Sequence, residues 1–298
     1  MNTQLRFATP LLLLSLGLGA ATASAQPAER GGGFELTARY SHTTSSDLND
    51  AGPAAEVGVD SFNLGLRARA PLAERTQLLY GLGWDRHELD RSGATWLPAT
   101  LKSLAAPVGV SHTFDHKWRL LVTATPRIAG ADGSLSTARF DLPVLALASY
   151  VQSPELTWSF GLRYGARSEI AVLPIAGVAW RFAPEWELKV GWPESGVSWR
   201  ATEQLTLRAV ATINGGDFRL GDDPRVLAER VGPSLANTWL EYREIRVGLA
   251  AEYAVSHALS VRAELGQVVD QRFEYIDRGV KLNGESPLYF GVGVVGRF

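Results

Sequence analysis

The chain contains no cysteine among its 298 residues. This absence excludes a disulfide framework, a thiolate zinc site, an iron–sulfur cluster and catalysis by a cysteine nucleophile. Net charge is small as well, because 29 Lys and Arg residues stand against 31 Asp and Glu residues, so no global field favours nucleic acid. Beyond residue 25, no apolar run reaches the roughly 18 residues that a transmembrane helix requires.

Residues 1–25 have the composition of a cleaved signal peptide. A basic start at Arg6 precedes an apolar core, and Ala23-Ser24-Ala25 forms a small-x-small cleavage site before Gln26. The apolar core is about ten residues long, whereas a membrane-spanning anchor needs roughly 20. We therefore expect export, with residues 26–33 as a short leader and residues 34–298 as one folded unit.

The rest of the chain alternates between apolar and polar residues with a period of two. Apolar residues stand at even positions in residues 34–41, 62–69 and 156–165, and at odd positions in residues 205–213. This is the pattern of a strand with one apolar and one polar face. Thirty Gly, nine Trp, eight Tyr and eleven Phe residues also favour strands and turns over helices. With the weaker segments included, about fourteen strands are predicted.

The expected connections alternate in length. Short connections are predicted at residues 71–76, 114–117, 152–155, 183–185, 202–204 and 254–258, and longer ones at 43–57, 89–98, 129–138, 214–236 and 270–287. Outer-membrane barrels have short periplasmic turns, longer external loops and an even number of strands. We predict an all-β fold, a transmembrane antiparallel up-and-down β-barrel of 12–14 strands. The lower number applies if the short hairpin around residues 186–201 does not cross the bilayer.

The aromatic residues and the C-terminal strand support this interpretation. On the apolar face, aromatic residues gather near both ends of the predicted strands, as the lipid–water boundary favours. The last strand ends in Phe298, with Phe290, Val292 and Val294 spaced two apart before it. This assembly signal resembles the C-terminal targeting strand of outer-membrane β-barrel proteins, which the barrel-assembly machinery recognises, although Gly296 departs from its usual pattern.

Two internal segments add a second resemblance. Residues 79–86 (Leu-Tyr-Gly-Leu-Gly-Trp-Asp-Arg) and 242–248 (Tyr-Arg-Glu-Ile-Arg-Val-Gly) are similar to motifs of a family of Gram-negative outer-membrane barrels known only as a domain of unknown function. The resemblance implies a barrel in the bacterial outer membrane, in contact with outer-membrane lipid and lipopolysaccharide. It implies no activity.

Ionisable side chains on the polar face of the strands are expected to line the lumen, because they avoid lipid. The candidate lumen-lining cations are Arg39, Arg67, Arg69, Arg119, Arg163, Arg181, Lys189, Arg208 and Arg262, together with Arg127, Arg246 and Arg297. The carboxylates of the same face are Glu35, Asp85, Asp141, Glu187, Glu244, Glu252 and Glu264. One hypothesis is a passive pore whose cationic lumen favours small anionic solutes. The alternative is that the charges pair and brace a plugged, non-conducting structural barrel or adhesin.

A third hypothesis is an outer-membrane barrel enzyme, a lipid or peptide hydrolase. Asp85 and His87 share a face at a spacing that allows the carboxylate to orient the imidazole, but no nucleophile with a defined partner accompanies them. We therefore predict no catalytic residues.

The long predicted loops likewise offer no clear binding site. Asp217, Asp222 and Asp223 lie in the long predicted loop 214–236, where Asp and Gly fit an ordinary turn better than a Ca²⁺ site. No metal site and no cofactor are predicted. The sequence leaves open whether loops 214–236 and 270–287 fold inward as a constriction or outward as a surface receptor.

Overall fold

A computed structural model describes residues 33–49, 55–94, 96–132, 139–166, 171–223 and 232–298. The predicted signal peptide and all of the predicted leader except Gly33 lie outside these residues. Among the described residues, no helix has the length and apolar character needed to cross a membrane.

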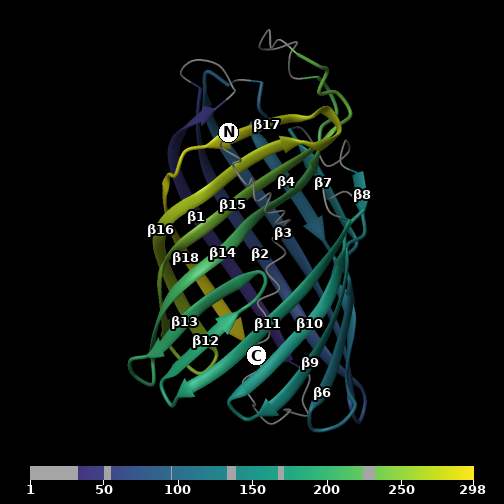
Figure 1. The fold of residues 1–298 in the computed structure, drawn as a ribbon, viewed down its shortest axis with the longest axis vertical. Helices are drawn as coiled ribbons and strands as arrows, with labels where there is room; N and C mark the ends of the chain where they lie inside the picture. Colours follow the sequence, from purple (N-terminus) through teal and green to yellow (C-terminus); the bar gives the residue numbers. More distant parts are fainter. Residues whose placement is uncertain (1–32, 50–54, 95, 133–138, 167–170, 224–231) are drawn as a thin grey trace, which may run out of the picture.

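The described residues form one sheet of eighteen strands and a single turn of 3-10 helix (Figure 1). The strands are β1 (Gly33–Asn49), β2 (Glu56–Ala73), β3 (Thr76–Ser92), β4 (Thr100–Ala105), β5 (Val108–Thr113), β6 (Trp118–Ala124), β7 (Arg127–Ala131), β8 (Arg139–Asp141), β9 (Val144–Ser153), β10 (Leu156–Tyr164), β11 (Val172–Ala183), β12 (Trp186–Val190), β13 (Glu194–Arg200), β14 (Leu205–Arg219), β15 (Trp239–Ala254), β16 (Leu259–Tyr275), β17 (Val280–Gly284) and β18 (Leu288–Arg297). The 3-10 turn, η2, spans Ile276–Arg278.

Four crossings of the wall are interrupted by proline. Pro107 separates β4 from β5, Pro126 separates β6 from β7, Pro143 separates β8 from β9, and Pro287 lies between β17 and β18. Proline breaks a ladder because it has no N–H to donate. Eighteen strands less four interruptions leave fourteen consecutive segments, the upper end of the predicted range.

The sheet closes on itself through β1, which pairs antiparallel with both β2 and β18. Every other neighbouring pair is also antiparallel, apart from one parallel bridge between Arg219 of β14 and Gly130 of β7. The six short turns share one end of the barrel with the start of β1 and the C-terminus (Figure 1). This confirms the predicted antiparallel barrel. By the convention of this fold class, the end with the short turns is the periplasmic end.

The turn between β5 and β6 illustrates why these connections are tight. Asp115 Oδ1 accepts backbone hydrogen bonds from Lys117 and Trp118, both at 2.7 Å. Because these donors stabilise the ionised carboxylate, they hold the pKa of Asp115 below its ordinary value. The side chain thus replaces backbone partners and reverses the chain within four residues, 114–117.

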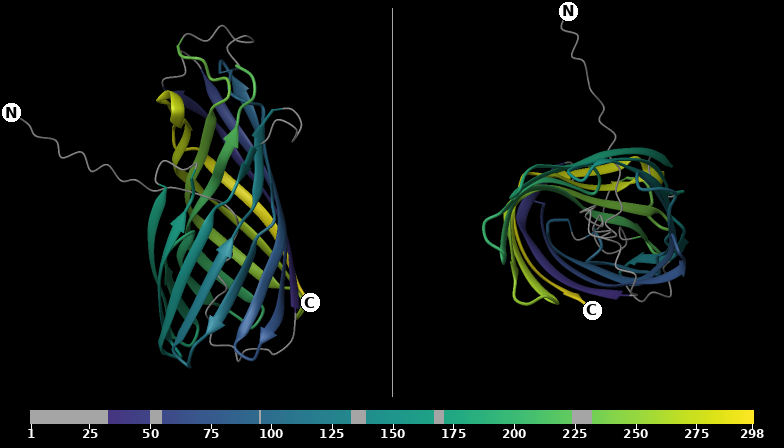
Figure 2. Two further views of the ribbon diagram at one scale, coloured as in Figure 1. Left: turned by 90° about the vertical axis from the view of Figure 1, so that its right-hand side faces the viewer. Right: turned by 90° about the horizontal axis from the view of Figure 1, so that it is seen from below.

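Figure 2 shows the barrel as a ribbon from a second side and from below. Its outer surface carries an apolar belt, because large apolar side chains of almost every wall strand are exposed on this face, among them Leu36, Leu64, Leu82, Phe160, Leu249, Leu265 and Val292. An exposed apolar band of this extent is the lipid-facing surface of a membrane barrel. The alternation in the sequence therefore corresponds to lipid outside and lumen inside.

The alternation reverses its phase toward the external end. In β2, Phe62 and Leu64 point outward and are exposed, whereas Val57 and Val59 point inward and are buried. The pairing of β2 with β3 is regular across this region, so no bulge causes the reversal. Outward positions above the belt carry charged groups instead, such as Asp60, which contacts His42 at 2.9 Å. Above the bilayer the outer face meets water, so the apolar side chains turn inward.

The strand extensions that carry this reversal occupy parts of four segments that the sequence predicts as loops. Residues 43–57, 89–98, 214–236 and 270–287 are not simply loops, because β1, β3, β14 and β16 extend to Asn49, Ser92, Arg219 and Tyr275 respectively. Each of these extensions carries apolar residues on the opposite face from the membrane-spanning part of the strand. In β3 and β14 the alternating pattern ends where its phase changes, although the strand continues. In β1 and β16 the apolar residues keep their parity, and a register shift in the pairing turns them inward.

The inward apolar residues of the extensions form a packed core at the external end. We call it the external core; it consists of Leu48, Ala55, Val57, Val59, Leu89, Ala94, Trp96, Leu97, Leu101, Ala129, Ala131, Phe218, Leu220, Leu235, Leu240, Tyr242, Phe273, Tyr275 and Leu282. Phe273 and Tyr242 stack with ring centroids 5.1 Å apart. The external part of the interior is therefore filled by side chains, as in a water-soluble protein.

Strand β14 also helps to fill the external end of the barrel, because its external part no longer pairs with its neighbour β13. Their pairing ends at Glu194 and Thr212, and the hairpin of β12 and β13 occupies only the lower wall (Figure 1). Beyond that point β14 reaches β7, where Arg219 bridges to Gly130 and Asp217 contacts Arg127 at 3.0 Å. The barrel is therefore built from fewer neighbouring strands at its external end, where β14 lies beside β7 in place of β13.

The seam of the barrel offers a stability prediction. Phe34 and Phe298 stack with ring centroids 4.9 Å apart and exchange two backbone hydrogen bonds of 2.9 Å. We expect a double-mutant cycle with Phe34→Ala and Phe298→Ala, measured by urea unfolding in lipid vesicles, to give a coupling of about 0.5–1.5 kcal/mol. Additive losses would show that the rings do not stabilise each other.

Candidate functional site

The lumen is the site that the sequence predicts, and the register shows where its cations lie. Each candidate cation alternates with outward-facing neighbours along its strand, so its side chain stands on the face opposite the apolar belt. This applies to Arg39 (β1), Arg67 and Arg69 (β2), Arg119 (β6), Arg163 (β10), Arg181 (β11), Lys189 (β12), Arg208 (β14) and Arg262 (β16). The structure does not gather these nine residues into one site. It divides them among several environments.

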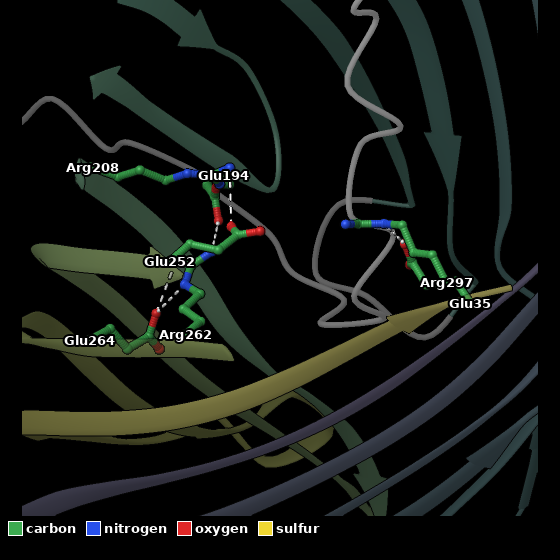
Figure 3. Close-up of polar contacts among 7 residues, drawn as sticks. All are labelled: Glu35, Glu194, Arg208, Glu252, Arg262, Glu264 and Arg297. Carbon is green, nitrogen blue, oxygen red and sulfur yellow. Dashed lines mark hydrogen bonds and ion pairs between the residues drawn. The ribbon is translucent and has the colours of Figure 1, made fainter. Parts of the chain in front are cut away.

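Two arginines belong to a network on the wall formed by β13 to β16, drawn in Figure 3. Arg262 contacts Glu264 at 3.0 Å and Glu194 at 3.5 Å. Arg208 contacts the other oxygen of Glu194 at 3.5 Å and Glu252 at 3.4 Å. All five side chains keep some exposure, between 12% and 25%. The charges of Arg208 and Arg262 are therefore largely offset by carboxylates.

Two further networks lie deeper, below the external core. Arg127 Nη2 contacts Asp141 at 2.9 Å and Asp217 at 3.0 Å, linking β7, β8 and β14. In the second network Arg246 pairs with Glu244 through its Nε at 2.8 Å and donates to Ser41 at 2.9 Å. The Arg127 pairs fix β7, β8 and β14 relative to one another, because separating them leaves a buried charge without a partner. Arg246 links β15 to β1 through its bond to Ser41.

Gln271 and Tyr289 complete the second network. Gln271 Nε2 donates to Glu244 at 3.0 Å, and Arg246 lies 4.8 Å from the centroid of the Tyr289 ring. Tyr289 lies flat against two facing glycines: a Cβ at Gly266 would be 2.9 Å from its ring, and one at Gly248 would be 2.6 Å from its hydroxyl. Glycine is required here by this close approach, and the aromatic ring covers the exposed backbone.

A third group of cations has no carboxylate within ion-pair distance among the described residues. It comprises Arg39, Arg69, Arg119, Arg181 and Lys189. Arg39, Arg69 and Arg119 are also exposed, whereas Arg181 and Lys189 are half-buried. Arg39, Arg69, Arg119 and Arg181 stand in the periplasmic half of their wall segments, and Lys189 lies in the short strand β12, which occupies only the lower wall (Figure 1). The excess positive charge of the lumen is therefore concentrated at that end.

Sequence reasoning missed two carboxylates that matter to this arrangement. Glu194 begins β13, the short strand where the alternation was weakest, and it bridges Arg208 and Arg262. The sequence predicts Asp217 in the turn of a long loop, but it lies in β14 and pairs with Arg127. Among the described residues, no group of three or more His, Asp or Glu side chains is arranged to hold a metal ion.

The proposed enzymatic residues do not form a pair with each other. Asp85 accepts hydrogen bonds from Asn63 at 2.7 Å and Ser103 at 3.0 Å. His87 Nδ1 instead lies 2.8 Å from the hydroxyl of Ser61, and both residues have no exposed surface. A serine next to a histidine is the beginning of a hydrolytic site, but a substrate cannot reach one that is sealed under the external core.

These features define the class of protein: an outer-membrane β-barrel with a polar interior in its membrane-spanning part and an apolar core above it. The chain belongs to the family described as Domain of unknown function (DUF6268), whose model matches residues 90–285. This agrees with the resemblance found in the sequence. No curated protein sequence matches the chain.

Several solved structures resemble the chain at low sequence identity. A deletion mutant of TodX, a monoaromatic hydrocarbon channel of Pseudomonas putida, is 12% identical, with 93% of this chain and 92% of that chain covered and a TM-score of 0.53. A Pseudomonas aeruginosa FadL homologue is 10% identical (89% of each chain, TM-score 0.47). An outer membrane channel from Pseudomonas putida F1 is also 10% identical (92% and 99%, TM-score 0.46). The likeness to the TodX mutant shows the same barrel fold.

Proposed function

We propose that the protein is a non-enzymatic outer-membrane channel for small anionic solutes, which enter its lumen from the periplasmic end. The observation that carries this proposal is the distribution of charge. Arg39, Arg69, Arg119, Arg181 and Lys189 have no carboxylate at ion-pair distance among the described residues, whereas Glu35, Glu194, Glu252 and Glu264 each contact an arginine. Unpaired arginine and lysine in a lumen favour anions.

The structural likeness to TodX supports a channel, since that protein is named as one. Its named solute class, monoaromatic hydrocarbons, does not suit this lumen. The inward positions of β1 and β2 in the membrane-spanning part include Glu35, Arg39, Arg67 and Arg69. Charged groups of this kind attract ionic solutes and repel apolar ones.

The external core requires that such a channel be closed in the conformation described. Residues of eight wall segments and of the β14 extension meet in this core, and its aromatic members are at most 6% exposed. Passage across the whole barrel therefore depends on separating β14 from β7. We propose that this contact is the closure of the channel.

Planar-bilayer recording tests the proposal. In a gradient of KCl, we expect discrete conductance steps whose reversal potential has the sign of anion preference. The variant Arg39→Gln/Arg69→Gln is expected to shift that potential toward cations, while Arg86→Gln, on the outer surface beside Glu88, leaves it unchanged. Steps with cation preference in the unmodified protein would contradict the anionic solute.

A second candidate function is a non-conducting structural barrel, which the external core and the buried ion pairs favour. Silence in the bilayer, both from the unmodified protein and from a variant with a disrupted external core, would establish this alternative over the channel. Both candidate functions place the protein in the outer membrane. We propose that residues 1–25 direct export and that the strand ending in Phe298 is recognised by the barrel-assembly machinery.

A further inference from the structure

One part of the lumen gathers arginine more densely than the rest. Arg39, Arg67, Arg69 and Arg297 stand on the inward face of β1, β2 and β18 near the periplasmic end, and we call them the arginine cluster. The register places Glu35 opposite both Arg67 and Arg297. Arg69 follows Arg67 two positions along β2, and Arg39 lies opposite Asn63, four positions from Arg67 on the other side. Figure 3 shows Glu35 and Arg297 apart from the network on β13 to β16.

A single carboxylate serves the whole cluster. Glu35 Oε2 accepts from Arg297 Nε at 3.0 Å, and Glu35 Oε1 lies 3.7 Å from Arg67. Arg67 is also repelled by the like charges of Arg39 and Arg69. Four guanidinium groups therefore face one carboxylate, which leaves an excess of about three positive charges at this place.

The nearest inward carboxylates on adjoining strands are already engaged. Asp85 of β3 accepts hydrogen bonds from Asn63 and Ser103, and Glu264 of β16 is bound to Arg262. Like-charge repulsion of this kind destabilises a folded protein unless something offsets it. A concentration of unpaired arginines is consequently better explained by an anion that binds there than by a role in the fold.

The backbone beside the cluster supplies room and orientation. Arg39 lies opposite Gly293 of β18, and a Cβ at Gly293 would be 3.1 Å from Arg39 Cγ, so this side chain lies across a position that has no side chain of its own. Arg67 similarly lies opposite Gly81 of β3. Planar guanidinium groups above small residues suit an oxyanion with several oxygens, because each group forms two parallel hydrogen bonds with it.

We propose that the arginine cluster is a binding site for a multivalent oxyanion carrying phosphate or carboxylate groups. This proposal specifies the class of solute for the proposed channel, and its biological meaning rests on that proposed function. Binding itself does not require conduction, because the cluster lies at the periplasmic end, below the external core. Monovalent chloride neutralises only part of the excess charge, so the cluster discriminates in favour of multivalent anions.

Equilibrium binding to the folded protein in detergent tests the site. Calorimetric titrations with pyrophosphate and with citrate, in a background of sodium chloride, distinguish phosphate from carboxylate chemistry. We expect saturable binding of one or both, and a loss of affinity of about tenfold or more in the Arg39→Gln/Arg69→Gln variant. The control is Arg86→Gln, which removes an arginine paired with Glu88 on the outer surface. Its affinity should equal that of the unmodified protein.

Several outcomes would overturn the site. Absence of binding by both probes, equal affinity in the double variant, or equal losses in Arg86→Gln each contradict it, the last because it indicates unspecific attraction. If the double variant does not fold, as shown by its gel mobility before and after heating, the single variants Arg39→Gln and Arg69→Gln replace it. Binding together with bilayer silence of both the unmodified protein and a variant with a disrupted external core would retain the site and reject the channel. Conductance without binding would retain the channel and reject the site.

Discussion

Replacement of Glu244 by alanine is expected to lower the free energy of unfolding by about 3–5 kcal/mol, because it leaves the buried Arg246 without its counter-charge. Neither side chain has more than 4% of its surface exposed, so solvent cannot substitute for the lost carboxylate. Gln271 loses its acceptor in the same variant. Urea unfolding in lipid vesicles, followed by tryptophan fluorescence, measures the change.

The control for this prediction is Glu252→Ala. Glu252 pairs with Arg208 at 3.4 Å, but both side chains are 23% exposed. Its loss is expected to be about 1 kcal/mol or less, as for other solvated ion pairs. A double replacement of Glu244 by leucine and Arg246 by methionine should recover much of the stability, since it removes both charges. Equal losses in Glu244→Ala and Glu252→Ala would refute the importance of burial.

The second large effect is expected from Phe218→Ala, in the part of β14 that reaches across the lumen. Phe218 is 2% exposed and lies edge-on to His87, with ring centroids 5.7 Å apart. Removing a buried phenylalanine ring costs about 3–5 kcal/mol. Because the ring is part of the proposed closure, the variant should also open more often in planar bilayers than the unmodified protein.

Phe290→Ala provides a matched control. Phe290 is 51% exposed and belongs to the outer apolar belt, so its replacement alters contacts with lipid and leaves the external core intact. We expect no change in the frequency of opening. An increase in Phe290→Ala as large as that in Phe218→Ala would mean that general destabilisation, and not loss of the closure, causes the openings.

The candidate site was predictable in part. The inward face of each membrane-spanning strand follows from alternation, so the positions of Arg39, Arg67 and Arg69 on that face could be expected. Which charges pair could not, because pairing depends on the register between strands. Glu194 contacts Arg262 across 68 positions of the chain, and Asp217 contacts Arg127 across 90. No local pattern contains such distances.

The sequence by itself determined the antiparallel barrel, its short turns and a range of 12–14 for the number of wall segments. Each of these follows from local constraints: a period of two creates two faces, and turn residues reverse the chain. The tertiary structure alone decided that β2, β3 and β16 continue above the membrane with their apolar faces inward. Val59 and Phe62 are only three residues apart, yet Val59 faces the external core and Phe62 faces the lipid. Hydrophobicity reports only that a side chain avoids water, so the assembled barrel must show on which side the water lies.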